Sequence, residues 1–200
     1  MRIILRAAAA SALCLCLASV PAFAQAPHVR GTIEALNGDR LTLKTEGGGT
    51  ETIELAPNWN VTVLKRIGLD EIKPGSFIGT AEMPQRNGTG RSLEVHVFPP
   101  GVKAGEGHYS WDLRKGSMMT NGTVGQVKAL GRGREITVSY PHGERRIVVP
   151  ANVPVVEFAN GERSQVKPGI GAFLIVAKSA DGALSSMGVA IGENGAKPPM

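Results

Sequence analysis

The chain contains an internal repeat, which restricts the folds open to it. Gly31-Thr32-Ile33 recurs as Gly122-Thr123-Val124, and Ile72-Lys73-Pro74-Gly75 recurs as Val166-Lys167-Pro168-Gly169. The first two segments are 91 positions apart and the second two are 94 apart, which an insertion of three residues near residues 131–133 explains. Two further blocks match in the same order between them, so we interpret the chain as two copies of one module.

Each copy has the pattern of short strands joined by tight turns. In the first copy, apolar and polar residues alternate over residues 33–43, and Asn37-Gly38-Asp39 in the middle predicts a hairpin. A single helical turn is predicted over residues 69–72, ended by Pro74-Gly75, and no longer segment of the mature chain has a helical period. Five or six short strands in about 70 residues cannot cover both faces of an open sheet, so we expect closure into a small barrel.

The predicted fold is therefore all-β, with two tandem small OB-like β-barrels joined by an irregular connector. The predicted boundaries are residues 25–98 for the first module, 99–121 for the connector and 122–192 for the second module, followed by a flexible tail at 193–200. A small β-sandwich for each module is the alternative.

Residues 1–24 have the pattern of a cleavable export signal. Arg2 and Arg6 precede an apolar run over residues 7–20, and a small-residue pattern predicts cleavage after Ala24. The apolar run is too short to span a bilayer as a helix, and no apolar stretch of spanning length follows it. We therefore expect a periplasmic or secreted protein without a transmembrane segment. Both cysteines, Cys14 and Cys16, lie in the signal, so the mature chain has no disulfide and no thiolate ligand or nucleophile.

The charge of the mature chain argues against a nucleic-acid partner. The full chain has a net charge of +5, of which the two arginines of the signal contribute two. The remaining basic residues are dispersed, and no basic run with interleaved aromatic residues occurs. We expect a protein partner in the cell envelope, or self-association.

The order of these blocks resembles that of a known family. A Gly-Thr-Ile or Gly-Thr-Val strand, a short hairpin, and an Ile/Val-Lys-Pro-Gly turn before a closing strand are similar to the exported bacterial β-domains known as domain of unknown function 5666. The resemblance covers both copies. It implies an exported, β-rich protein without catalytic activity.

The predicted connector differs in composition from a simple linker. It contains Tyr109 and Trp111 although aromatic residues make up only 4% of the chain, and linkers are normally rich in Gly, Ser and Pro. One interpretation is that the segment packs against one or both modules, with Trp111 as an apolar plug. The other is a small site or a partner-facing patch that includes His108, Trp111 and Asp112.

The same segment provides the only candidate metal ligands. His108 with Met118 or Met119, and with Asp112 as a further ligand, could bind copper or zinc, because imidazole and thioether groups suit these metals. The alternative is that the two methionines fill gaps in the core.

The sequence indicates no catalytic machinery. It has no Gly-x-Ser-x-Gly motif, no Cys nucleophile in the mature chain and no phosphate-binding glycine loop before a helix. We therefore predict a non-catalytic binding or accessory protein without a cofactor. The alternative is a periplasmic copper or zinc carrier that uses His108, Met118 and Met119.

Overall fold

The computed structural model describes residues 27–200, so the predicted export signal and its cleavage site lie outside the described residues. These residues form an all-β protein, as the sequence predicts. They contain no α-helix, and no helix among them is long and apolar enough to cross a membrane. The three helical segments are short 3-10 turns, η1 (Leu69–Glu71), η2 (Arg163–Gln165) and η3 (Glu193–Gly195), and η1 confirms the predicted helical turn.

The strands of the first half are β1 (His28–Asn37), β2 (Arg40–Thr45), β3 (Thr50–Arg66), β4 (Phe77–Pro84), β5 (Gly90–Ser92), β6 (Val95–Val97) and β7 (Gly107–Ser110). Those of the second half are β8 (Met118–Leu130), β9 (Gly133–Tyr140), β10 (Gly143–Val149), β11 (Val155–Gly161), β12 (Gly171–Ile175), β13 (Ala177–Lys178) and β14 (Leu184–Gly192). The predicted hairpin joins β1 to β2, and its Gly38 has a φ of 62°, which glycine adopts without strain.

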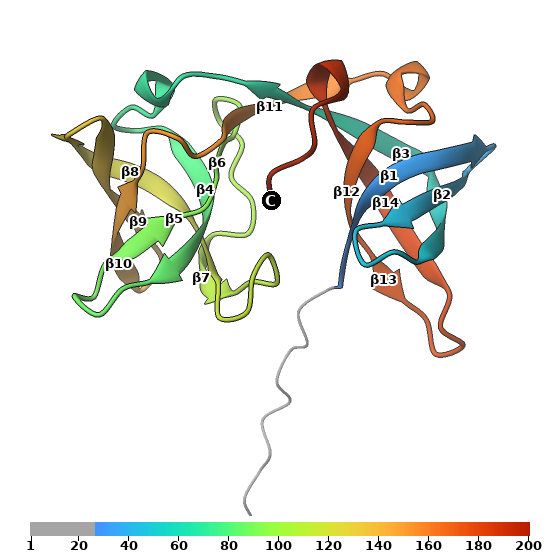
Figure 1. Cartoon of the computed structure of the whole chain (residues 1–200), viewed down its shortest axis with the longest axis horizontal. Coiled ribbons are helices and arrows are strands. Elements are labelled where there is room, and N and C mark those ends of the chain that lie inside the picture. Colours follow the sequence, from blue (N-terminus) through green and yellow to red (C-terminus); the bar gives the residue numbers. More distant parts are fainter. Residues whose placement is uncertain (1–26) are drawn as a thin grey trace, which may run out of the picture.

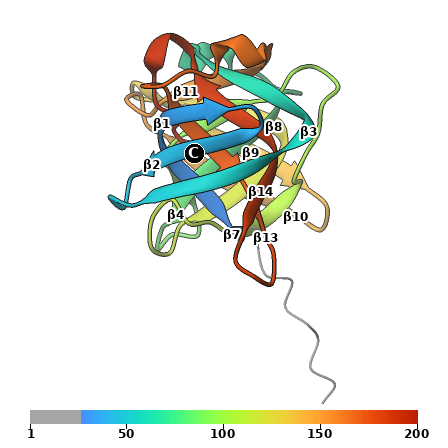
Figure 2. The ribbon, with the colours of Figure 1, turned by 90° about the vertical axis from the view of Figure 1, so that its right-hand side faces the viewer.

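Five strands close into a mixed β-barrel, which we call the first barrel. Its strands pair in the ring β1–β2–β3–β14–β12, and β12 returns to β1. All these pairs are antiparallel except β3 with β14, which is parallel. Figure 2 looks at this barrel with β1, β2, β3 and β14 wrapped around its axis.

The strands β4, β8, β9, β10 and β5 pair in a second ring of the same form, which we call the second barrel. Here β4 pairs with β8, β8 with β9, β9 with β10, β10 with β5, and β5 returns to β4. The parallel pair is β5 with β10, the counterpart of β14 with β3. Figure 1 shows the two barrels side by side.

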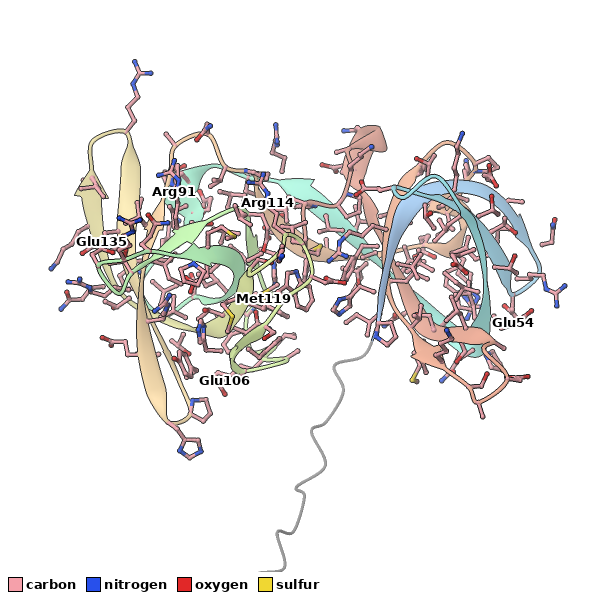
Figure 3. All side chains as sticks on the ribbon, turned by 60° about the horizontal axis from the view of Figure 1, so that its bottom comes forward. Glu54, Arg91, Glu106, Arg114, Met119 and Glu135 are labelled. Carbon is pink, nitrogen blue, oxygen red and sulfur yellow. The ribbon has the colours of Figure 1, made fainter. Side chains whose placement is uncertain are left out.

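Each barrel combines strands from both sequence copies, which differs from the expected pair of contiguous barrels. Strands β1 to β3 of the first copy are completed by β12 and β14 of the second, and β8 to β10 of the second copy are completed by β4 and β5 of the first. The register of the exchange is equivalent in both barrels, because Gly171 pairs with Thr32 just as Phe77 pairs with Thr123. As a result Glu54 and Arg91, which lie in the same copy, are found on different barrels (Figure 3).

In the first copy the exchange follows the long strand β3, which runs from the first barrel toward the second. This strand has 17 residues and spans about 55 Å at the usual rise of a β-strand, so it leaves the first barrel and carries the following β4 to the second. Residues 61–66 of β3 pair antiparallel with β11, which crosses in the opposite direction (Figure 1), and residues 61–64 also pair with β14 of the first barrel. Leu64 and Phe158 are partners at this crossing and are 94 positions apart, so the two copies are related by an approximate twofold axis there.

Three apolar clusters stabilise this arrangement. The first barrel has a core that includes Ile33, Leu41 and Leu174, and the second a core that includes Ile78, Val138 and Ile147. A smaller cluster lies between the barrels and contains Leu64, Val156, Phe173 and Met200, with Trp111, Phe158 and Ala190 packed against it.

The predicted irregular connector contains regular structure. Strand β7 lies within it and pairs with the first residues of β8, His108 opposite Thr120 and Tyr109 opposite Met119. Between β7 and β8 the chain forms a tight turn in which the Ser117 hydroxyl donates to the carbonyl oxygens of Trp111 and Arg114.

Candidate functional site between the barrels

The connector returns from the second barrel to contact the first, and Trp111 is at the centre of this contact. Its ring lies 4.2 Å from the ring of His28 and 6.3 Å from that of Phe173, measured between centroids. The Arg30 guanidinium lies 5.2 Å from the Phe173 centroid and 6.0 Å from the Trp111 centroid, within the range of cation–π attraction. Trp111 thus packs against β1 and β12 of the first barrel.

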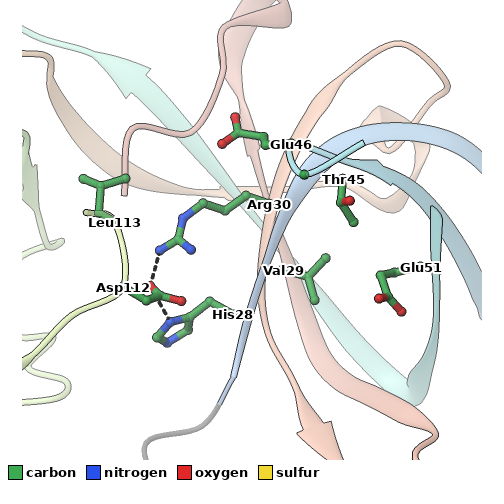
Figure 4. Close-up of a pocket in the computed structure, with 9 residues that line it drawn as sticks. His28, Val29, Arg30, Thr45, Glu46, Glu51, Asp112 and Leu113 are labelled. Atoms are coloured by element: carbon green, nitrogen blue, oxygen red, sulfur yellow. Dashed lines mark hydrogen bonds and ion pairs between the residues drawn. The ribbon is translucent and has the colours of Figure 1, made fainter. Parts of the chain in front are cut away.

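Asp112 adds a polar clamp beside this aromatic contact. Its Oδ1 accepts a hydrogen bond of 2.6 Å from Arg30 Nη2 and lies 3.0 Å from His28 Nδ1 (Figure 4). Because an ionised carboxylate can only accept, the Nδ1 atom of His28 carries the proton in this contact. Two side chains of β1 therefore hold one carboxylate of the connector.

The surroundings set the charge of this clamp. Burial lowers the pKa of the His28 imidazole, although Asp112 offsets part of that effect. Partial burial by itself raises the pKa of the Asp112 carboxyl, but the hydrogen bond and charge of Arg30, followed by those of His28, outweigh it and hold the pKa below its ordinary value. At neutral pH the clamp therefore joins an ionised Asp112 to a cationic Arg30 and a neutral His28.

Two cavities adjoin the contact between the barrels. One has a volume of about 310 Å³ and lies beside the clamp, lined by charged side chains that include Arg30, Glu46, Glu51 and Asp112 (Figure 4). The other has a volume of about 640 Å³ and lies where β3 and β11 cross, and we call it the crossing-strand cavity. It is lined by Leu64, Arg66, Pro154 and Val156 of the crossing segments and by Glu193, Asn194, Ala196, Lys197 and Pro199.

On the second barrel a buried polar group faces the same region. The Glu94 carboxylate accepts from the amide of Ala81 at 2.6 Å and lies 3.0 Å from His96 Nδ1, and the His96 ring stacks on Phe158 of β11 at 5.0 Å. Nearby, Asn121 Nδ2 donates to the Tyr109 hydroxyl at 3.1 Å. Burial raises the pKa of the Tyr109 phenol, which therefore stays protonated. These contacts fix the second barrel against the crossing strand and hold Tyr109 in place.

The structure places the three predicted metal ligands on two sides of one sheet. His108 lies opposite Thr120, so Met118, two residues away from Thr120, shares its face. Met119 projects to the other face, where it is buried opposite Tyr109. Only His108 and Met118 can therefore approach one metal ion, and residues 27–200 contain no group of three His, Cys, Asp or Glu side chains that could hold one. The copper or zinc site remains a prediction.

A charged cluster that the sequence analysis did not identify lies inside the second barrel. Glu82 is fully buried, and its Oε1 accepts a hydrogen bond of 2.7 Å from Arg145 Nε, while its Oε2 has no partner among the described residues. His108 Nδ1 lies 3.9 Å from the same Oε1 and 2.8 Å from the Thr120 hydroxyl. Burial, and then the charge of Arg145, lower the pKa of His108, so its imidazole is neutral at pH 7. The guanidinium on Glu82 also disfavours a metal cation at this carboxylate.

The structure thus separates the predicted connector residues into two groups. Trp111 and Asp112 contact the first barrel, whereas His108 belongs to the interior cluster of the second barrel with Glu82. The signal for Glu82 was present in the repeat: the equivalent position, 94 residues later, is Val176, so one copy has a carboxylate where the other has an apolar core residue.

Comparisons with known proteins assign neither the fold nor the site. No protein-family model matches the chain, and searches of curated proteins and of solved structures found no match. The resemblance to domain of unknown function 5666 therefore remains a prediction, and the site is interpreted from its own geometry.

Proposed function

We propose that this chain is an exported, non-catalytic binding protein made of two OB-like modules, and that it holds a segment of a partner protein of the cell envelope between its barrels. The observation that carries this proposal is the crossing-strand cavity. Its volume of about 640 Å³ falls within the range of ordinary ligand sites, and its walls combine the apolar Leu64 and Val156 with the cationic Arg66.

The strand order supports the OB-like part of the proposal. In each ring the first strand pairs with the second and fourth, and the third pairs in parallel with the fifth, as in an OB fold. A short 3-10 turn, η1 or η2, stands where OB folds have a helix between their third and fourth strands. Barrels of this kind serve as binding modules through their loops and one face.

The composition of the cavity favours a protein segment over a sugar or a nucleic-acid base. Sugars and bases are held mainly by stacking on exposed aromatic rings, and none of the nine residues that line the cavity is aromatic. Aliphatic side chains and prolines suit the apolar side chains of a polypeptide, and Arg66 can donate to its carbonyl oxygens.

Site-specific photo-crosslinking in the source organism tests this proposal. A photoreactive amino acid at Arg66, which is exposed at the cavity, should give a discrete adduct with a second protein. The same group at Leu130, which is 50% exposed at the end of β8, is the matched control and should give none. The absence of an adduct at Arg66, or equal adducts at both positions, would contradict the proposal, and an adduct of two copies of this chain would replace the partner by self-association.

A further inference from the structure

The last residues of the sequence occupy the region between the barrels. We call residues 196–200 the strap. Met200 is only 3% exposed and packs in the apolar cluster with Leu64, Val156 and Phe173, two of which also line the crossing-strand cavity. Figure 1 shows this end of the chain between the two barrels.

Few directional contacts hold the strap in place. Among the described residues, its hydrogen bonds are one from Arg30 Nε to the main-chain oxygen of Met200, at 2.8 Å, and one from its own Ala196 amide to Glu193. An ion pair between Lys197 and Glu46 is 3.9 Å long and exposed on both sides. No strand within residues 27–200 pairs with the strap, so its attachment depends mainly on burial of the Met200 side chain.

The repeat places the start of the strap at a position equivalent to one in the first copy. Lys103 and Lys197 are 94 positions apart, the spacing of the two copies. Lys103 Nζ lies 5.8 Å from the ring of Phe77, and a Cβ on Gly171, the equivalent of Phe77, would lie 3.2 Å from the Cα of Lys197. The first copy continues from this point into the connector, whereas the second presents Pro198, Pro199 and Met200 to the space between the barrels.

The strap begins in an extended conformation, and its prolines favour the same conformation. Ala196 has φ −61° and ψ 147°, which is the polyproline II region, and two of the next four residues are proline. Polyproline II segments are bound in many proteins by aromatic side chains, because the peptide loses little conformational entropy on binding. Here the aromatic residue Phe173, with Trp111 packed against the same cluster, accompanies Met200, and Arg30 donates to the main-chain oxygen of Met200.

We propose that the strap is an internal ligand of the binding site, and that the partner contributes a segment of the same chemistry: an extended, proline-containing peptide with a large flexible apolar side chain that takes the place of Met200. This inference rests on the proposed function. The strap forms one wall of the crossing-strand cavity through Ala196, Lys197 and Pro199, and Met200 fills the apolar cluster beside it. The partner segment must displace Met200 to reach that cluster, so the strap lowers the affinity for the partner.

Peptide binding to a chain without residues 196–200 tests the inference. The synthetic peptide Ala-Lys-Pro-Pro-Met should bind this shortened chain and change its tryptophan fluorescence, because Trp111 packs against the cluster that receives Met200. The matched peptide Ala-Lys-Pro-Pro-Ser should bind at least about tenfold more weakly, since it lacks the buried side chain. The intact chain should bind either peptide at least about tenfold more weakly than the shortened chain binds the first. Equal affinities for both peptides, or for both chains, would overturn the inference.

A substitution in the intact chain covers the case in which the shortened chain does not fold. Met200→Ser weakens the anchor without removing the main chain that Arg30 contacts, so it should raise the affinity for Ala-Lys-Pro-Pro-Met, and an unchanged affinity would overturn the inference. Photo-crosslinking at Arg66 separates the two proposals. If Met200→Ser increases the partner adduct, both stand. If the adduct forms but does not change, the proposed function stands and the strap inference fails, and if no adduct forms in either chain the proposed function itself fails.

Discussion

The two barrels are built from equivalent strands, yet they fill one part of the interior differently. In the first barrel Val176 belongs to the apolar core and Leu184 packs against it. The equivalent residues of the second barrel, 94 positions earlier, are Glu82 and Gly90. A Cβ on Gly90 would lie 1.6 Å from Glu82 Oε2, so the carboxylate takes the space next to the backbone that a side chain at position 90 would occupy.

The aliphatic interior of the first barrel shows that this fold does not require a charge inside a barrel. The first barrel has aliphatic side chains at these positions, and its equivalent of Arg145 is the exposed Glu51. The second barrel provides a counterion for its buried carboxylate, with Arg145 Nε 2.7 Å from Glu82 Oε1. A buried ion pair is often no more stable than an apolar pair of similar size, so the polar interior is a property of the second barrel and not of the fold.

Removal of Arg145 should have the largest effect on the free energy of unfolding. Arg145→Ala leaves the buried Glu82 without its charge partner, and the free energy of unfolding should fall by about 3–5 kcal/mol. Glu51→Ala, the matched change on the first barrel, should alter it by less than about 0.5 kcal/mol because Glu51 is exposed. Urea denaturation of both variants checks this, and a cost below about 1 kcal/mol for Arg145→Ala would show that the pair does not stabilise the second barrel.

Substitution of Gly90 should have the next largest effect. The added methyl group of Gly90→Ala would meet Glu82 Oε2, so we expect a loss of about 1–3 kcal/mol by chemical denaturation. Gly47→Ala is the control, since the nearest atom to its added Cβ is Thr45 Oγ1 at 3.9 Å. In a Glu82→Ala background the cost of Gly90→Ala should disappear, because the two changes share one contact. Strictly additive costs would contradict the packing of Glu82 over Gly90.

The pH dependence of stability should be different without the Glu82 charge. Burial raises the pKa of the Glu82 carboxyl, and the hydrogen bond and charge of Arg145 offset only part of this rise. A carboxyl with a higher pKa in the folded than in the unfolded state loses stability as the pH rises through the folded value. The unchanged protein should therefore become less stable relative to Glu82→Gln as the pH increases from 4 to 8.

Denaturation of the two proteins across this range measures the difference, in which the effects of the other titrating groups cancel. At pH 4 the protonated carboxyl and the glutamine amide should give similar free energies of unfolding. A difference that stays constant, or that favours the unchanged protein as the pH rises, would mean that Glu82 has no raised pKa.

Breaking a surface ion pair of the first barrel should have the smallest effect on the free energy of unfolding. Arg40 Nε lies 2.7 Å from Glu54 Oε1, the same distance as in the Arg145–Glu82 pair, but the two side chains are 64% and 51% exposed. Water and salt screen this pair, so Arg40→Ala should cost less than about 1 kcal/mol. A cost as large as that of Arg145→Ala would show that burial is not what distinguishes the two pairs.

The sequence predicted the elements well because each depends on local residues. The alternation around Asn37-Gly38-Asp39 specifies the β1–β2 hairpin, and Pro74-Gly75 ends the helical turn η1. The pairing partner of each strand, in contrast, does not depend on local residues. Both copies have equivalent strand edges, so either β4 or its equivalent β12 could complete a given barrel. The second copy has a turn between β10 and β11, at positions equivalent to residues 56–60 of the continuous β3, and both copies still exchange their last strands. No local turn signal therefore specifies the exchange.

The candidate site was predictable only in part, for a related reason. The unusual composition near Trp111 and Asp112 indicated the connector, but their contacts on β1, Arg30 and His28, are more than 80 positions away in the sequence. Glu82 gave a usable signal only when compared with Val176, its equivalent in the other copy.

Paired cysteines show directly whether the two copies exchange strands. Residues 27–200 contain no cysteine, so each pair can be introduced alone. Glu54 and Ser185 are exposed partners on β3 and β14, whereas a contiguous first module would place Glu54 beside Arg91, the equivalent of Ser185. Under mild oxidation Glu54→Cys with Ser185→Cys should form an intramolecular disulfide, visible by non-reducing electrophoresis and mass spectrometry, and Glu54→Cys with Arg91→Cys should not. A disulfide in the second variant and none in the first would show that each copy closes its own barrel.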